Sequence, residues 1–193
     1  MVNWLQLHPF LKRQRMIQKS NQSKIVERHR YKKVDGVYTI FETTELKFQP
    51  WIYKKEDSQL YIDKVKDYLT PDLVESKYQK RNETNRFFGH CYHATQLLSF
   101  LLDKELDAYS GQDENGELHW WLQDGEHIID VTKEQYNIFG ISPPYDNGKK
   151  TSWYGWKQRP HMKTLKLLQN ITDVAVTTKR VETCSKNTTA LDI

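Results

Sequence analysis

Hydrophobic residues recur at helical spacing in three stretches of the chain. The middle stretch is the most apolar, and its stripe consists of Ala94, Leu97, Leu98, Leu101 and Leu102. Apolar residues three and four positions apart are typical of a helix that packs one face against a core. We therefore expect a buried helix with residue 91 in its first turn, and further helices over 58–69 and 161–171. A short helix is also expected over 70–78, because Pro71 suits the first helical position.

Other stretches have the composition of strands. Residues 36–41 and 46–53 are rich in β-branched and aromatic side chains, and 106–110 forms a shorter stretch of the same kind. Pro50 weakens the second of these strands, since proline cannot donate to a sheet. Together with the helices, these strands predict an α+β domain.

A predicted β-hairpin places a histidine beside an aspartate. Residues 118–123 and 126–131 are expected to pair, because Asp124-Gly125 between them is a strong signal for a two-residue turn. With this turn, His119 faces Asp130, and directly opposed residues have Cβ atoms roughly 4.5–5.5 Å apart. An imidazole and a carboxylate at this separation can form a hydrogen bond that orients the ring. A register slip of one residue would separate them.

Cys91 stands in the first turn of the expected buried helix. The positive end of the helix dipole and the unpaired backbone N–H groups there favour a thiolate. The same N–H groups can stabilise an oxyanion on an attacked carbonyl. A cysteine at a helix start, followed by His119 and Asp130 on neighbouring strands, predicts a thiol-dependent acyl-transfer site. Alone, each residue has an ordinary structural explanation: a buried thiol, or a histidine that packs in a strand.

The segments around these three residues resemble a known family. They are Gly89-His90-Cys91-Tyr92-His93-Ala94, His119-Trp120-Trp121-Leu122, and Ile128-Ile129-Asp130-Val131-Thr132 with Gln135-Tyr136. They resemble the YunG-like proteins, an uncharacterised bacterial and phage group similar to papain-like enzymes of the NlpC/P60 and transglutaminase-like kind. Val131 stands where that pattern usually has leucine, and Tyr136 where it has phenylalanine.

The resemblance spans residues 80–171 and carries implications for fold and mechanism. It implies a papain-like, NlpC/P60-like α+β core in which the N-terminal helix with the catalytic cysteine packs on an antiparallel sheet. It also implies that Cys91 is the nucleophile, His119 the base and Asp130 the orienting acid. It supplies no substrate beyond a small-molecule or peptide acyl group. It would make the chain a phage or bacterial hydrolase or acyltransferase.

Several aromatic and polar residues near these motifs are candidates for substrate contact. The candidates are Gln112, Trp120, Trp121, Tyr145, Trp153, Trp156 and Arg159. The segment 142–160 combines rings, cations and glycines, which suits the rim of a cleft; it equally suits a surface loop whose rings pack onto the core. Gln112 would lie beside His119 if Asn115-Gly116 formed a two-residue turn, and otherwise it is a surface turn residue.

Composition and charge divide the chain into three parts. The 193 residues include 24 aromatic ones, enough for one domain with a core. The net charge of +4 is uneven, because residues 1–33 hold nine Lys/Arg against one acid. We therefore expect a basic leader over 1–35, the papain-like domain over 36–172 and a polar tail over 173–193. The leader could contact nucleic acid or an acidic partner. Its use by a non-catalytic binding module, contacting a host protein or nucleic acid, is the alternative function.

The sequence also argues against several classes of protein. No stretch approaches the ~18 apolar residues of a membrane span. The first residues do not resemble an export signal, which favours the reducing cytoplasm, or the host cytoplasm for a phage protein. Cys91 and Cys184 lie in such different settings that a disulfide is not expected. The histidines near Cys91 could suit zinc, but with one nearby thiol and no paired ligand motif we expect no metal and no cofactor.

Overall fold

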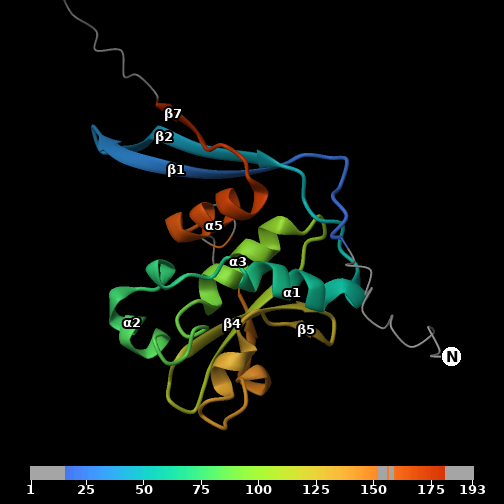
Figure 1. Ribbon diagram of the computed structural model, residues 1–193. Helices are drawn as coiled ribbons and strands as arrows, with labels where there is room; N and C mark the ends of the chain where they lie inside the picture. The colour runs from blue at the N-terminus through green and yellow to red at the C-terminus, as the bar shows by residue number, and fades with distance from the viewer. Residues whose placement is uncertain (1–15, 152–155, 157–158, 181–193) are drawn as a thin grey trace, which may run out of the picture.

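The computed structural model describes residues 16–151, 156 and 159–180. These residues form a mixed α+β structure with two antiparallel sheets and four α-helices (Figure 1). The first sheet has the order β1-β2-β7, with β1 at Lys24–Val34, β2 at Val37–Phe48 and β7 at Thr177–Arg180. The second has the order β5-β4-β3-β6, with β3 at Asp107–Gln112, β4 at Leu118–Asp124, β5 at His127–Ile129 and β6 at Lys149–Lys150. The expected α+β class is confirmed at this level.

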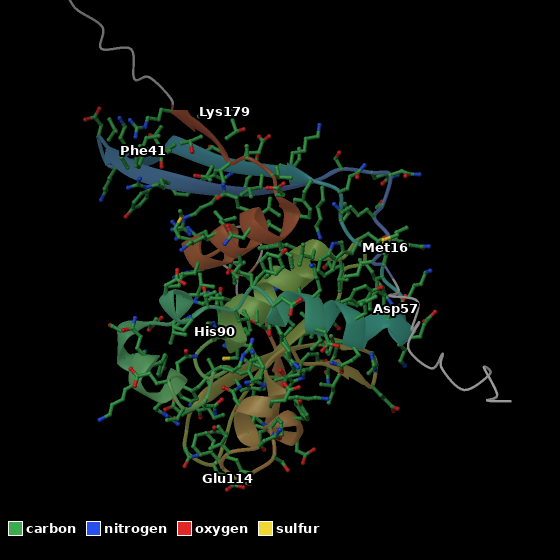
Figure 2. The ribbon with its side chains drawn as sticks, viewed as in Figure 1. Met16, Phe41, Asp57, His90, Glu114 and Lys179 are labelled. Atoms are coloured by element: carbon green, nitrogen blue, oxygen red, sulfur yellow. The ribbon has the colours of Figure 1, made fainter. Side chains whose placement is uncertain are left out.

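The helices are α1 (Ser58–Lys66), α2 (Ser76–Asn82), α3 (Cys91–Leu101) and α5 (Met162–Thr172). Three of the helices, α5, α3 and α1, lie between the two sheets, and α2 lies to one side of them (Figure 1). Short 3₁₀ turns are η1 (Lys55–Asp57), η2 (Pro71–Leu73), η3 (Lys133–Tyr136) and η4 (Tyr145–Asn147). Figure 1 shows α5 below the three-stranded sheet, α3 and α1 in the middle, and the four-stranded sheet on the other side. Figure 2 shows Phe41 and Lys179 on the first sheet and Glu114 at the opposite end of the molecule.

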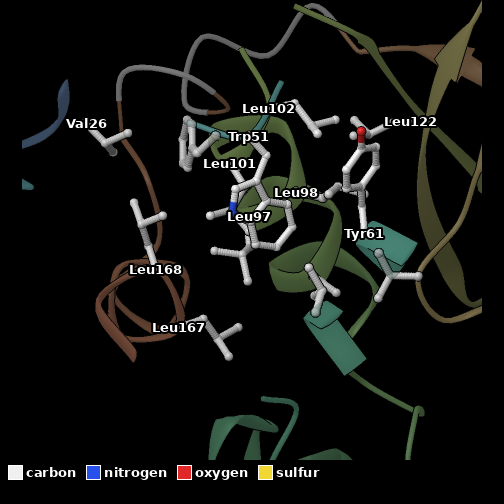
Figure 3. Packing of buried hydrophobic residues seen from close by; sticks show 14 of the residues in the cluster. Val26, Trp51, Tyr61, Leu97, Leu98, Leu101, Leu102, Leu122, Leu167 and Leu168 are labelled. Carbon is white, nitrogen blue, oxygen red and sulfur yellow. The ribbon is translucent and has the colours of Figure 1, made fainter. Parts of the chain in front are cut away.

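Helix α3 is the centre of the core, as its apolar stripe predicts. Ala94, Leu97, Leu98 and Leu101 are all fully buried. Their neighbours come from every layer, and Figure 3 shows Leu167 and Leu168 of α5, Trp51, Tyr61 of α1 and Leu122 of β4 around them. Burying each such side chain stabilises the fold by ~1.5–3 kcal/mol. The packing fixes the start of α3, and therefore Cys91, against β4.

The hairpin of β4 and β5 exists, but its turn differs from the expected one by one residue. Asp124 pairs with His127, so Gly125-Glu126 rather than Asp124-Gly125 forms the two-residue turn. Gly125 has φ +61°, and a two-residue hairpin turn needs this conformation at its first central position when the second has negative φ. Glycine adopts it at no steric cost.

The expected basic leader is in part a strand. Residues 24–34 form β1, which pairs along its length with β2, and β2 is one continuous strand instead of the two predicted. Three of the basic side chains serve this packing: Lys24 donates to the carbonyl oxygens of Ser99 and Leu102, Arg28 to that of Pro160, and Arg30 pairs with Glu42. The residues before 16 and after 180 lie outside the described residues.

The helix expected over 70–78 is interrupted. Val74 adopts an extended conformation with ψ 142°, which separates η2 from α2. The Val74 side chain is buried, and this packing outweighs the preference of the surrounding residues for a continuous helix. The helix over 161–171 is confirmed as α5, and the His161 ring accepts a hydrogen bond from the Lys163 amide at its start.

Among the described residues, no helix has the length and apolar character that crossing a bilayer requires.

Candidate active site

The expected contact between His119 and Asp130 is present. Nε2 of His119 lies 2.6 Å from Oδ2 of Asp130, and both side chains are 1% exposed. Asp130 directly follows β5 and so sits diagonally from His119 instead of directly opposite. The two remain on one face of the hairpin because the shift in register is an even number of positions.

Cys91 opens α3 beside this pair. Its thiol donates to the carbonyl oxygen of Leu118, the residue before His119, over 3.6 Å. The side chain of the N-cap residue His90 makes no capping hydrogen bond at the start of α3, where the positive end of the helix dipole favours an anion. Gly89 precedes the helix at φ +83°, and a Cβ there would lie 2.8 Å from Cγ1 of Val74. The glycine of the motif is therefore required by both conformation and space.

Asp130 is held by two further donors. The Tyr145 hydroxyl donates to Oδ2 over 2.8 Å, and the Thr132 amide donates to Oδ1 over 2.8 Å. With His119, three donors therefore fix a buried carboxylate. Hydrogen bonds of this kind stabilise the ionised form and hold its orientation. Burial and the charge of Asp130 raise the pKa of Tyr145, so its hydroxyl keeps the proton that it donates.

The other nitrogen of His119 faces Gln135 and Cys91. Nε2 of Gln135 lies 2.7 Å from Nδ1 of His119, and Gln135 is itself buried. With Nε2–H donating to Asp130, Nδ1 of the neutral ring is an acceptor, and the Gln135 amide donates to it. Sequence reasoning did not select Gln135 as a site residue. Its place five residues after the aspartate, in the quoted motif, was the available signal.

The electrostatics of the site favour an imidazolium. Burial alone lowers the pKa of His119, but the charge and hydrogen bond of Asp130 outweigh it, and Cys91 adds to their effect. The result is a His119 pKa raised above its ordinary value. Such a shift marks a histidine able to hold a proton taken from a neighbouring thiol.

A pocket with a volume of about 290 Å³ lies in front of Cys91. Gln135 also lines it, together with six aromatic side chains: Tyr78, Phe88, Tyr92, Trp120, Tyr136 and Phe139. A second hollow lies beyond Leu118, which lines both spaces together with Asp113. Cys91 is therefore accessible from the pocket, whereas His119 is shielded from solvent.

The expected substrate-contact residues divide into three groups. Trp120 lines the Cys91 pocket and Gln112 lines the second hollow. Trp121 is fully buried and stacks on His119 at 6.0 Å, and Trp156 is buried against Trp120 at 5.2 Å. Trp121 and Trp156 therefore pack against residues of the site and are too buried to contact a substrate.

The remaining candidates lie elsewhere. Tyr145 contacts Asp130, and the Arg159 guanidinium lies 5.4 Å from the ring centre of Tyr31 on β1, outside the lining of the Cys91 pocket. Trp153 lies outside the described residues. Gln112 pairs with Leu118 and not with His119, because residues 113–117 form a longer loop than the expected two-residue turn.

Three other histidines surround the start of α3. His90 is fully buried, and neither ring nitrogen has a partner among the described residues. Burial, followed by the charges of Lys163 and Arg86, lowers the pKa of His90 to about 4. Burial also lowers the pKa of His93 to about 3, and its ring packs 4.5 Å from that of His161. These imidazoles are neutral at pH 7.

In the part of the chain that the structure describes, no three histidine, cysteine or acidic side chains converge as metal ligands. Comparison of the full chain with protein-family models, curated proteins and solved structures gave no match.

Proposed function

We propose that the chain is a thiol-dependent acyl-transfer enzyme, an amidase, peptidase or acyltransferase that uses Cys91, His119 and Asp130. The observation that carries this proposal is the buried 2.6 Å hydrogen bond between His119 and Asp130 beside a cysteine at a helix start. An oriented imidazole next to a thiol is the arrangement that activates a cysteine nucleophile.

The proposed reaction has two halves. Cys91 transfers its proton to Nδ1 of His119, and the thiolate attacks an amide, ester or thioester carbonyl. The resulting oxyanion is stabilised by the first amides of α3, the Cys91 N–H among them. Nδ1–H then protonates the leaving group as the tetrahedral adduct collapses to a thioester on Cys91. Water or an amine, deprotonated by His119, releases the acyl group.

Asp130 acts on His119 throughout this cycle. Its charge stabilises the imidazolium that forms when Cys91 loses its proton. The Gln135 amide must leave or turn away when Nδ1 carries a proton, since two donors cannot face each other. Gln135 also lines the pocket, so a bound substrate can displace it.

The papain-like core and the YunG-like kinship belong to the same proposal. They are supported by a helix that starts at the nucleophile and packs on an antiparallel sheet whose hairpin carries the histidine, with the aspartate directly after it. A catalytic thiol must stay reduced, which suits the cytoplasm. The alternative is a binding module that uses its basic leader. Lys24, Arg28 and Arg30 make contacts within the protein, which leaves less of the leader's positive charge available to a partner.

Alkylation of Cys91 by iodoacetamide tests the proposal. Rates are measured from pH 5 to pH 9, and the labelled peptide is identified by mass, which separates Cys91 from Cys184. We expect fast labelling at pH 6 in the wild type and a fall to the rate of an ordinary thiol, whose pKa is ~8.5, in His119→Ala.

Asp130→Asn and Asp124→Asn form a matched pair in this assay. Asp124 lies in the same hairpin but at the surface, where it pairs with Lys104 at 2.8 Å. We expect only Asp130→Asn to reduce labelling at pH 6. Equal rates in the wild type, His119→Ala and Asp130→Asn would refute the proposed function.

A further inference from the structure

The walls of the Cys91 pocket carry information about the group that it accepts. Rings from α2, α3, β4 and η3 line it, together with Phe88 and Phe139. Several rings are held by one another: Tyr92 packs edge-on against Trp120 at 5.1 Å, and Tyr78 against Phe88 at 5.5 Å. Preformed aromatic walls favour an apolar occupant without a large cost of ordering.

Two carboxylates on the rim of the pocket pair with basic side chains. Glu75 pairs with Lys77 at 3.3 Å, and Glu117 pairs with Arg81 at 2.7 Å. Asp113 accepts from the backbone amides of Asn115 and Glu117 through Oδ1. Apart from Asp113, the rim carboxylates are paired, so a charged group entering the pocket would lose its water for little return.

Two histidines at the pocket add no charge. His93 and His161 both line it, and burial lowers the pKa of each below its ordinary value. Their rings contact each other at 4.5 Å, so protonating one disfavours protonation of the other. Burial therefore disfavours positive charge on this wall of the pocket.

The volume limits the size of the occupant. A space of about 290 Å³ lies at the low end of small-molecule pockets, which span roughly 300–1,000 Å³. It has room for a ring-sized side chain.

The second hollow has the opposite character. It lies beyond Leu118 and is lined by Gln112, Asp113, Asp146, Asn147 and Lys149, with two glycines and a serine. Leu118 is 50% exposed between the two spaces, and its carbonyl accepts from the Cys91 thiol. A substrate that crosses Leu118 therefore meets apolar walls on the Cys91 side and polar groups on the other.

We propose that the acyl donor carries one uncharged, ring-sized apolar group in the Cys91 pocket, on the acyl side of the attacked carbonyl, and a polar leaving group across Leu118. This inference rests on the proposed function and specifies its substrate class: peptides or related esters with an aromatic acyl residue. The acyl side is assigned to the first pocket because Cys91 retains the acyl group. Cys91 lines this pocket and not the second hollow.

Four probes that differ only in one side chain test this inference. They are the acetylated chloromethyl ketones of phenylalanine, alanine, glutamate and lysine, which alkylate a thiolate with loss of chloride. We expect the phenylalanine probe to label Cys91 at least about tenfold faster than the alanine probe, a usual gain for filling an apolar pocket. The glutamate and lysine probes should be no faster than the alanine probe.

Phe139→Ala and Ile138→Ala provide matched variants for the same series. Phe139 lines the pocket, whereas its neighbour Ile138 is 61% exposed and does not. The preference for the phenylalanine probe should fall in Phe139→Ala and persist in Ile138→Ala, and the iodoacetamide rate should be unchanged in Ile138→Ala.

The outcomes separate the inference from the function on which it rests. Equal rates for the four probes, faster labelling by a charged probe, or no labelling by any of them overturns the inference if iodoacetamide labelling still depends on His119. Loss of that dependence on His119 instead refutes the proposed function.

Discussion

Replacing His90 by leucine should protect the fold against acid. The ring is fully buried with both nitrogens unpartnered among the described residues, and its pKa is lowered to about 4. The native ring therefore stays neutral at a pH where the unfolded chain, with a histidine pKa of ~6.5, has taken up a proton. Because the unfolded state binds more protons, stability is fully present above pH 6.5 and is lost as the pH falls toward 4.

The size of this effect follows from the shift. Between pKa values of 6.5 and about 4, one histidine removes about 2.5 kcal/mol from the free energy of unfolding at pH 4.5 and almost nothing at pH 7.5. His90→Leu cannot take up this proton. The variant should therefore lose about 2.5 kcal/mol less than the wild type between the two pH values. At pH 7.5 the free energy of unfolding of His90→Leu should match or exceed that of the wild type, because the substitution removes a buried ring whose nitrogens make no hydrogen bonds.

Urea unfolding at pH 7.5 and pH 4.5 measures both quantities. Phe88→Leu is a suitable control, because it reduces a buried apolar side chain two residues away and binds no proton. Its loss of stability should be the same at the two pH values. If the wild type and His90→Leu lose equal stability on acidification, the buried neutral imidazole is not a source of acid sensitivity.

Three further substitutions test the support of the site. Asp130→Asn should fold but transfer acyl groups about 10³-fold more slowly, as seen by single-turnover kinetics, because it removes the charge that stabilises the His119 imidazolium. Tyr145→Phe should lower the free energy of unfolding by ~1.5 kcal/mol in urea titrations, since it deletes a hydrogen bond to a buried carboxylate; an unchanged midpoint would contradict the role given to that bond. Gly148→Ala should destabilise the fold by ~1–3 kcal/mol and slow the alkylation of Cys91, because the new Cβ would lie 2.3 Å from Cζ2 of Trp121, which stacks on His119. A melting curve that overlays the wild type would show that this packing is looser than the distances indicate.

The meeting of His119 and Asp130 was predictable from the sequence even though the predicted turn was wrong by one residue. Moving the turn from Asp124-Gly125 to Gly125-Glu126 shifts every cross-strand partner by two positions. Side chains alternate between faces with a period of two, so an even shift preserves which face each residue occupies. The contact is therefore present as a diagonal one, with Nε2 of His119 2.6 Å from Oδ2 of Asp130. Likewise, the strong periodicity of α3 fixed Cys91 at a helix start.

Contacts that depend on distant segments were not predictable in this way. Tyr145 was expected to touch substrate, yet it donates to Asp130, because η4 returns over the hairpin. Residues 24–34 were assigned to a leader because their charge hides the alternation, and their strand is stabilised by pairing with β2. Gln112 pairs with Leu118 instead of the predicted His119, because the 113–117 loop shifts the register by one residue. A shift of one residue places Gln112 and His119 on opposite faces of the sheet. Local sequence does not encode the lengths of such loops or the contacts between segments that lie far apart in the chain.

The hydrogen bond of Tyr145 to Asp130 joins the two hollows mechanically. Asp146 and Asn147, the next residues of η4, line the polar hollow, while Tyr145 itself holds the carboxylate that sets the charge of His119. A ligand that shifts η4 on its polar side thus changes the donors around Asp130, and with them the basicity of the imidazole facing Cys91. Under the proposed function, a leaving group in the polar hollow would therefore act on Cys91 through a single phenol, Tyr145, from the other side of Leu118.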